Sequence, residues 1–303
     1  MHEPRLNSDL LDRLNEASVR KRHYPFETVH IDWQVPITDE WLYCPESGVP
    51  FFSMPEYERF TPSERVFLSR CRSASMAEAG IQLEQILIEG LTRLVRCYDP
   101  RSPLYRFMMH ELGEETQHVL MFSAWLKKLN LPTPQLDPQL RVALPILGLL
   151  ASRQPVLFFM VVLTGELTTD VIQADAIRDE RLHPTLRQLV RLHHVEELRH
   201  ISFGKEFVRQ EYQALPRAER KLMRSLAPVI AKAIGQSLSR VPAYEGLPAW
   251  VSPKLLAQAA HANARQEMLS KAFRPLMGFM EEAEILTGAE RGLWRAAGFE
   301  TPA

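Results

Sequence analysis

The sequence has few cysteines and no paired-cysteine motif. Only three occur in 303 residues, Cys44, Cys71 and Cys97, and no two of them form a CxxC. An odd number of widely spaced cysteines is typical neither of a disulfide framework nor of a thiolate zinc site. We therefore expect a protein of a reducing compartment, the cytoplasm.

Dense basic stretches and long apolar stretches are also missing. The 36 Lys and Arg nearly balance the 37 Asp and Glu, so the sequence predicts neither a nucleic acid nor an anionic membrane as partner. The N-terminal stretch, from Met1 to His30, mixes acids and bases without an apolar segment, which predicts no secretory signal. The longest apolar run, VLFFMVVL at residues 156–163, is far shorter than the roughly 20 residues of a membrane span. We expect it to be buried inside the protein.

Period-two alternation of apolar and polar residues is absent, which argues against a β-sheet. Apolar residues instead recur at intervals of three and four, the pattern of amphipathic helices. The predicted helices cover residues 64–98, 101–129, 154–180, 184–213, 217–241, 253–270 and 271–287. The fold class is therefore all-α.

Proline is concentrated ahead of these helices. Residues 24–63 contain six prolines with aromatic residues between them, a composition that stops helices and suits an extended arm laid over a surface. We divide the chain into an N-terminal arm at residues 1–63, a helical bundle at 64–215, and C-terminal helices of the same domain at 216–303.

Two glutamates fall on apolar faces of the predicted helices. Glu84 shares a line with Ala77 and Leu91, and Glu166 directly follows VLFFMVVLTG. A buried, unpaired carboxylate costs several kcal/mol, so each must be protonated, paired with a cation or bound to a metal. Glu89 lies among polar residues instead, and we expect it to be solvated.

A repeated pattern connects these glutamates to two Glu-x-x-His motifs. The separation between the buried glutamate and the glutamate of the motif that follows it is the same in both cases, and the whole triplet recurs with one constant offset. In a helix, residues i and i+3 face the same way, so each motif directs a carboxylate and an imidazole at one point. The first triplet is Glu84, Glu115 and His118, and the second is Glu166, Glu197 and His200. Two hairpins related by a pseudo-twofold axis would bring them together.

This ligand set is typical of di-iron and di-manganese carboxylate proteins, in which two helices each provide a glutamate and two others each provide Glu-x-x-His. A single Glu-x-x-His would be weak evidence, because most such pairs lie on solvated faces. Two in register with two buried glutamates favour a metal centre. The imidazoles favour iron, and manganese is also accepted by such a set.

His193 extends the pattern. It precedes Glu197 by four residues and His200 by seven, so it lies on the same face. Its counterpart under the offset between the two triplets is Glu111. A core histidine bonded to a backbone carbonyl is the alternative, but the position on the metal-facing stripe favours a seventh ligand. His194 points away from this stripe and is expected to be supporting or structural, and Glu114 and Glu196 likewise turn off the stripe.

Five parts of the sequence resemble the AurF-type non-haem di-iron N-oxygenases, the para-aminobenzoate N-oxygenase family. They are VHIDWQVPITDEWLYCP, MAEAGIQLEQIL, HELGEETQHVLMF, Glu166 and LHHVEELRHISFGKEF. The resemblance runs from about residue 20 to about residue 215, and its most specific element is His193 with Glu197 and His200. It implies a ferritin-like four-helix bundle with seven ligands to two irons: Glu84, Glu115, His118, Glu166, His193, Glu197 and His200.

The resemblance also implies an activity. Two ferrous ions would deliver electrons to O₂, and the enzyme would oxidise an arylamine to a hydroxylamine and onward to a nitroso or nitro product, as in natural product biosynthesis. An external electron donor or reductase would return the electrons. Relatives hydroxylate carbon instead, so a di-iron C-hydroxylase is an alternative.

Two other functions need different features. A ferritin-like metal-binding protein without an organic substrate needs little beyond four helices, whereas this chain adds an arm and about 90 C-terminal residues. A radical-generating subunit needs a tyrosine near the metals, but Tyr98 and Tyr105 fall at a predicted turn. We expect residues 216–303 either to close a substrate channel or to form a homodimer interface.

Overall fold

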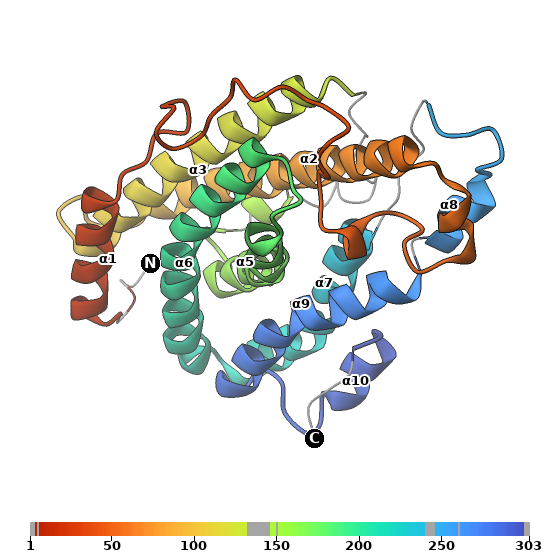
Figure 1. Ribbon diagram of the computed structural model, residues 1–303. Helices are drawn as coiled ribbons and strands as arrows, with labels where there is room; N and C mark the ends of the chain where they lie inside the picture. Colours follow the sequence, from red (N-terminus) through yellow and green to blue (C-terminus); the bar gives the residue numbers. More distant parts are fainter. Residues whose placement is uncertain are drawn as a thin grey trace.

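The structure is a computed structural model that describes residues 4, 6–131, 146–149, 151–239, 246–259 and 261–299. Within these ranges no β-strand is present, only an isolated bridge between Leu42 and Leu182. The main helices are α1 Ser8–Arg20, α2 Pro62–Val95, α3 Pro103–Leu129, α5 Pro155–Arg178, α6 Pro184–Ala214, α7 Arg217–Ser239, α8 Pro253–Ala259, α9 Asn263–Glu282 and α10 Arg291–Ala296 (Figure 1). The predicted all-α class is confirmed.

Two helix hairpins form the centre of the fold. Helix α2 packs against α3, and α5 packs against α6. Contacts between α2 and α5 and between α3 and α6 join the two hairpins. This arrangement is a ferritin-like four-helix bundle, as predicted.

Each helix of the bundle begins with a proline in its first turn. Proline suits this position because its φ is fixed near the helical value and it has no N–H group to leave unsatisfied. At α2, Thr61 and Glu64 add a capping box, in which each side chain accepts a hydrogen bond from the backbone N–H of the other. At α3 the Ser102 hydroxyl accepts from the Tyr105 N–H. The four prolines are Pro62, Pro103, Pro155 and Pro184.

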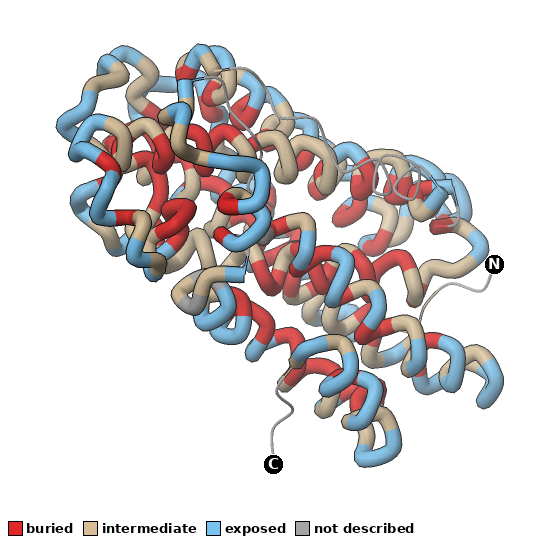
Figure 2. Tube along the Cα trace, turned by 90° about the vertical axis from the view of Figure 1, so that its right-hand side faces the viewer, coloured by how far each residue is buried: buried red, intermediate tan, exposed pale blue. Residues whose placement is uncertain are grey.

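Helix α5 lies in the middle of the molecule. Among the helices described here, it alone is long and apolar enough to cross a bilayer. The prediction that its apolar segment is too short for a span therefore holds for the uninterrupted run but not for the whole helix. Inside the protein, 61% of its most apolar stretch is buried, against α6, α7 and α9 among others. Burial, rather than length, marks α5 as a core helix. Figure 2 shows that buried residues gather in the interior, between the helices.

The N-terminal arm contains a helix that the sequence analysis did not predict. The Asn7 side chain caps α1 by accepting hydrogen bonds from the Asp9 and Leu10 N–H groups. Leu11 and Leu14 bury one face of α1, which contacts α3 and α6. The apolar face is too short to stand out in a charged sequence. Residues 21–61 then run over the bundle with only short 3₁₀ turns.

The C-terminal helices are present, but one boundary was predicted wrongly. The break expected at residues 270 and 271 lies inside α9, and α8 already ends at Ala259. Pro275 does not interrupt α9, because the flanking Leu276 and Met277 are buried in the core and hold the helix in place. The predicted C-terminal end of the helix at residues 217–241, which corresponds to α7, lies outside the described residues.

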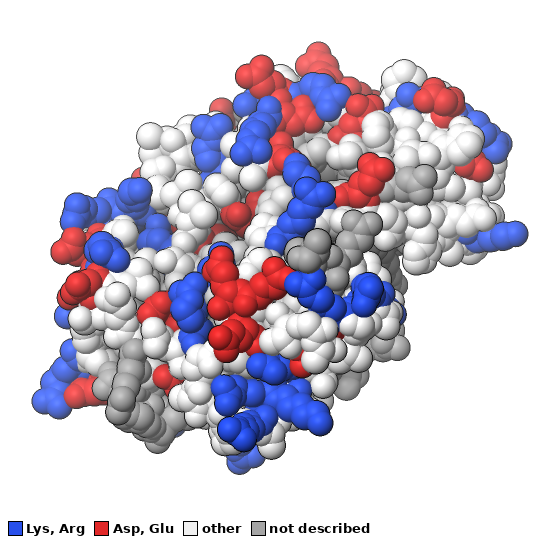
Figure 3. All heavy atoms as spheres, turned by 90° about the horizontal axis from the view of Figure 1, so that it is seen from below, with Lys and Arg blue, Asp and Glu red and all other residues white. Residues whose placement is uncertain are grey.

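The face seen in Figure 3 carries charged side chains of both signs. Lys and Arg lie beside Asp and Glu there, in keeping with a net charge of −1. Helices α7 and α9 pack against α5, and α10 packs against α7. The C-terminal residues therefore cover α5, while the metal-ligand motifs lie in the bundle between α2, α3 and α6.

Candidate metal centre

Four side chains from three helices form a first buried group. Glu84 comes from α2, His118 from α3, and His193 and Glu197 from α6. One candidate ligand atom from each lies within 4.8 Å of all the others. His193 Nε2 is 3.0 Å from Glu84 Oε1 and 3.5 Å from Glu197 Oε1. The group therefore presents two imidazole nitrogens and two carboxylates to one point.

A second buried group lies beside the first. It consists of Glu111 and Glu115 on α3 and His200 on α6, again with candidate ligand atoms within 4.8 Å of one another. His200 Nδ1 is 2.8 Å from Glu115 Oε1 and 3.4 Å from Glu197 Oε1. Because Glu197 Oε1 is also 3.3 Å from His118 Nδ1, this carboxylate touches both groups. The arrangement can hold two cations with Glu197 between them.

Glu111 is the member of these groups that the sequence analysis did not choose. It is only 1% exposed, and its Oε2 has no hydrogen-bond partner. Burial raises the pKa of Glu111 to about 8. Its position was noticed as the counterpart of His193, and it lies one helical turn before Glu115. That spacing could have identified it, although a lone glutamate at i−4 is more often solvated.

Glu166 is the one predicted ligand that belongs to neither compact group. Both of its carboxylate oxygens are buried without a hydrogen-bond partner among the described residues. Burial and the Glu197 carboxylate raise its pKa well above the usual range, while His200 acts in the opposite direction. Glu166 therefore lies within electrostatic reach of the second group, on the α5 side of the bundle.

The carboxylates of the centre have very different proton affinities. Burial, reinforced by Glu115 and Glu197, raises the pKa of Glu84 well above its usual range. At Glu115 burial acts in the same direction, but His118 and His200 outweigh it and lower the pKa to about 2. One carboxylate thus keeps its proton while its neighbour ionises. A divalent cation would stabilise the ionised form of all of them.

Each of the three histidines has one ring nitrogen in the centre and the other bound outside it. A carboxylate or amide in this outer position fixes the ring orientation, and a carboxylate also raises ligand basicity. The distances are 2.9 Å for His118 Nε2 to Glu196 Oε2, 2.8 Å for His200 Nε2 to Glu114 Oε2, and 3.0 Å for His193 Nδ1 to Gln173 Oε1. Glu114 and Glu196 do turn away from the ligand stripe, and this position lets them hold the histidines.

Two further residues near the centre have structural contacts. His194 Nδ1 is 2.6 Å from Asp170 Oδ1 on α5, away from both ligand groups. Arg199 is buried. Its guanidinium donates to Glu114 Oε1 at 2.7 Å. The positive charge of Arg199 is therefore paired with Glu114, which belongs to neither ligand group.

The unsatisfied atoms in the centre are a test of whether metals fit. Most buried polar atoms in proteins have a hydrogen-bond partner, so a cluster of atoms without one needs an explanation. Among the described residues, atoms of this kind are Glu111 Oε2, both carboxylate oxygens of Glu166, and Glu197 Oε2. Carboxylate oxygens and imidazole nitrogens are the donors that suit iron and manganese. The residues present therefore fit two such ions.

Comparison with known proteins identifies similar sequences. A family model described as P-aminobenzoate N-oxygenase AurF matches residues 5–284. The match extends beyond the motifs at both ends, from the N-terminal arm to the C-terminal end of α9. Proteins Mb0909 of Mycobacterium bovis and MT0908 and Rv0885 of Mycobacterium tuberculosis, all described as uncharacterized, are each 33% identical over 219 residues. The alignment covers 70% of this chain and 63% of each relative, less than two thirds of their length.

Proposed function

Because the chain belongs to the para-aminobenzoate N-oxygenase (AurF) family, we propose that it is a di-iron oxygenase that transfers oxygen from O₂ to the nitrogen of an amine, with arylamines as the substrate class. The observation that carries this proposal is the pair of adjacent buried ligand groups sharing Glu197. The candidate ligands are Glu84, Glu111, Glu115, His118, Glu166, His193, Glu197 and His200. Manganese in place of iron is the alternative metal.

The protein side chains would position the reaction and keep it dry. When bound, two ferrous ions supply two electrons for the reduction of O₂. Burial and the neighbouring His118 lower the pKa of His193 to about 4, so its ring is neutral at pH 7 and available as a ligand. The Phe122 ring lies 4.9 Å from the His193 ring and excludes water on that side. Glu196 and Glu114 hold His118 and His200 in the orientation that directs Nδ1 inward.

The overall reaction has a defined balance. Conversion of an amine to a hydroxylamine consumes one O₂, two electrons and two protons, forms one N–O bond and releases one water. Oxidation to the nitroso and nitro levels repeats oxygen transfer at the same nitrogen. An external donor or reductase is needed to return the electrons. A cytoplasmic location, a homodimer and a role in natural product biosynthesis remain predictions.

The test follows the oxygen atom. Iron-loaded protein is given 4-aminobenzoate or aniline, a chemical reductant and ¹⁸O₂, and the products are analysed by mass spectrometry. We expect ¹⁸O on nitrogen in hydroxylamine, nitroso or nitro products. The control is Glu197→Ala, which removes the carboxylate shared by both ligand groups.

Two results would contradict the proposal in different ways. Label on a ring carbon would identify a C-hydroxylase. Oxygen consumption that deposits ferric oxide without any labelled organic product, over a panel of arylamines, would identify a ferritin-like metal-binding protein.

A further inference from the structure

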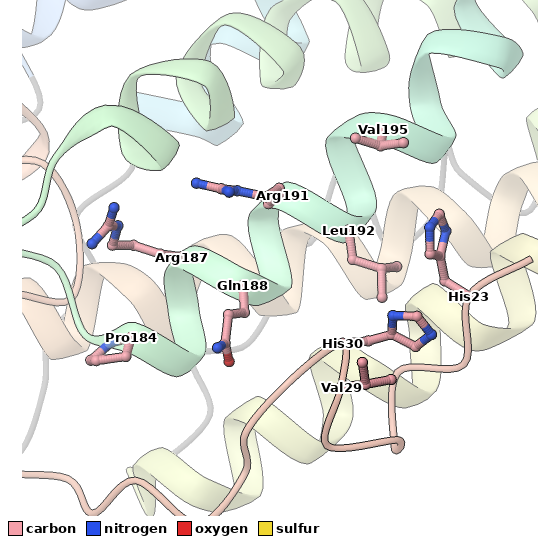
Figure 4. A pocket seen from close by; sticks show the side chains of 9 residues that line it. All are labelled: His23, Val29, His30, Pro184, Arg187, Gln188, Arg191, Leu192 and Val195. Atoms are coloured by element: carbon pink, nitrogen blue, oxygen red, sulfur yellow. The ribbon is translucent and has the colours of Figure 1, made fainter. Parts of the chain in front are cut away.

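A pocket of about 510 Å³ lies between α6 and the segment that follows α1 (Figure 4). Arg191, which lines the pocket, precedes His193 by two residues. Two residues correspond to about 200° around a helix. The pocket is therefore on the side of α6 opposite to the metal centre. His23 and His30 line it from the other side, with ring centroids 5.2 Å apart. His23 Nδ1 is 2.9 Å from Glu196 Oε1, the carboxylate that holds His118.

The charged and titratable groups of this lining are all basic. They are His23, His30, Arg187 and Arg191, and no Asp or Glu lines the pocket. The two imidazoles have carboxylate neighbours, since His23 binds Glu196 and His30 Nε2 is 3.7 Å from the exposed Glu27. No salt bridge from either arginine is found within the described chain. The pocket therefore has an excess of positive charge.

Arg187 has a donor that needs an acceptor. Its Nε is buried and has no hydrogen-bond partner within the described ranges. Asp179, the carboxylate on which Arg187 acts electrostatically, is held mainly by Arg181, with an N–O distance of 2.9 Å. In Figure 4 the guanidinium groups of Arg187 and Arg191 extend from the same side of α6. Guanidinium groups bind carboxylates through two parallel hydrogen bonds, so an anion with planar oxygens suits this end of the pocket.

The rest of the lining is apolar except for Gln188, whose Oε1 accepts a hydrogen bond from the Asp32 N–H at 2.8 Å. Leu192 is buried beneath the pocket, and Val29 is 82% exposed at its rim. Pro184 and Val195 add to this wall. Apolar side chains with a few convergent polar groups are typical of small-molecule sites. We propose that this pocket binds a small organic carboxylate with an apolar body, at a site separate from the metal centre and independent of the proposed oxygenase function.

The experiment titrates sodium hexanoate into the full chain and measures binding by calorimetry, with hexanamide and phosphate as comparison ligands. We expect one hexanoate site per chain. Hexanamide and phosphate should each bind at least about tenfold more weakly, because neither combines the carboxylate with the apolar body. The titration is repeated after chelation of metals. Binding should persist, since the site is on the other side of α6.

Variants place the binding in this pocket. Val29→Asp adds a carboxylate at the exposed rim and should weaken hexanoate binding by about tenfold or more. Its matched control, Val19→Asp, changes an exposed valine of α1 outside the pocket and should have no effect. Arg187→Gln and Arg191→Gln should each weaken binding about tenfold, whereas Arg101→Gln, at a 90% exposed side chain between α2 and α3, should not.

Melting temperatures confirm that the variants are folded. Hexanoate affinity that is unchanged in folded Val29→Asp would overturn the proposal. Equal affinity for hexanamide would show that the carboxylate is not recognised, and tighter binding of phosphate would show a site for inorganic anions. Loss of hexanoate binding on chelation would place the ligand at the metal centre instead.

Discussion

The two hairpins of the bundle carry the same triplet of candidate ligands but complete it differently. Four positions before the glutamate of the Glu-x-x-His motif, α3 has Glu111 and α6 has His193. The first buried group therefore offers two imidazoles, from His118 and His193, whereas the second offers one, from His200. The lone glutamates also differ, because Glu84 binds His193, whereas Glu166 has no hydrogen-bond partner in the part of the chain that the structure describes.

This difference shows that a repeated sequence need not produce two equal metal sites. The repeat provides the helices and their separation, while a single exchanged residue sets the donor atoms. A site richer in nitrogen favours metals later in the divalent series, and a site richer in carboxylate accepts manganese more readily. We therefore expect the two sites to differ in affinity and in metal preference.

Removing the shared carboxylate should have the largest effect. Glu197→Ala takes a ligand from both groups at once, so we expect metal content to fall from about two ions per chain to near zero and oxygenase activity to fall more than about 100-fold. Elemental analysis measures the first and product formation the second. Glu89→Ala, at a partly exposed ion pair with Arg93, should keep both metals. Two retained ions in Glu197→Ala would disprove the shared position.

Removing each of the two residues that differ, His193 and Glu111, tests directly whether the two sites differ in metal affinity. His193→Ala should weaken one step of an anaerobic ferrous titration by about 100-fold, and Glu111→Ala should weaken the other step by a similar factor. The two steps are distinguished by competition with manganese, which we expect to occupy the site that contains Glu111. If both variants weaken the same step, the two groups are not separate sites.

The outer partners should have smaller effects. Glu196→Ala and Glu114→Ala leave every ligand in place but free the ring of His118 or His200, so metal affinity should fall by about 10-fold. His194→Ala, whose ring binds Asp170 outside both groups, should change affinity less than about twofold. Competition with a chelator of known affinity measures all three. If Glu196→Ala or Glu114→Ala binds metal as tightly as wild type, the histidine ring that this carboxylate contacts needs no support from it.

The pH dependence of the metal-free protein should show the smallest effect. Burial raises the pKa of Glu111 from near 4.5 to about 8, so the folded state holds a proton that the unfolded state has lost. Stability from this residue is present below about pH 4.5 and is lost as the pH rises towards 8. Between pH 5 and pH 8, the melting temperature of Glu111→Gln should therefore fall less than that of wild type, and the difference should be on the order of a few degrees. Glu89→Gln, as control, should follow wild type.

Much of the fold could be predicted because helices are local. The three- and four-residue spacing of apolar residues predicted the four bundle helices to within a few residues. Helix α1 was missed because its buried face depends on a few leucines that become apolar contacts only against α3 and α6. The end of α8 and the continuity of α9 through Pro275 depend on packing that a local pattern does not contain.

The sequence by itself determined which residues share a helix face, since the separations within Glu115-x-x-His118 and His193-x-x-x-Glu197 are fixed by the turn of the helix. The tertiary structure decided which faces meet. The packing of α3 against α6 brings Glu111 to His200 and places Glu114 and Glu196 on the outer nitrogens of His200 and His118, and the position of α5 leaves Glu166 outside both compact groups. These contacts join residues far apart in the chain, and their geometry depends on the angle and distance between helices, which no local spacing specifies.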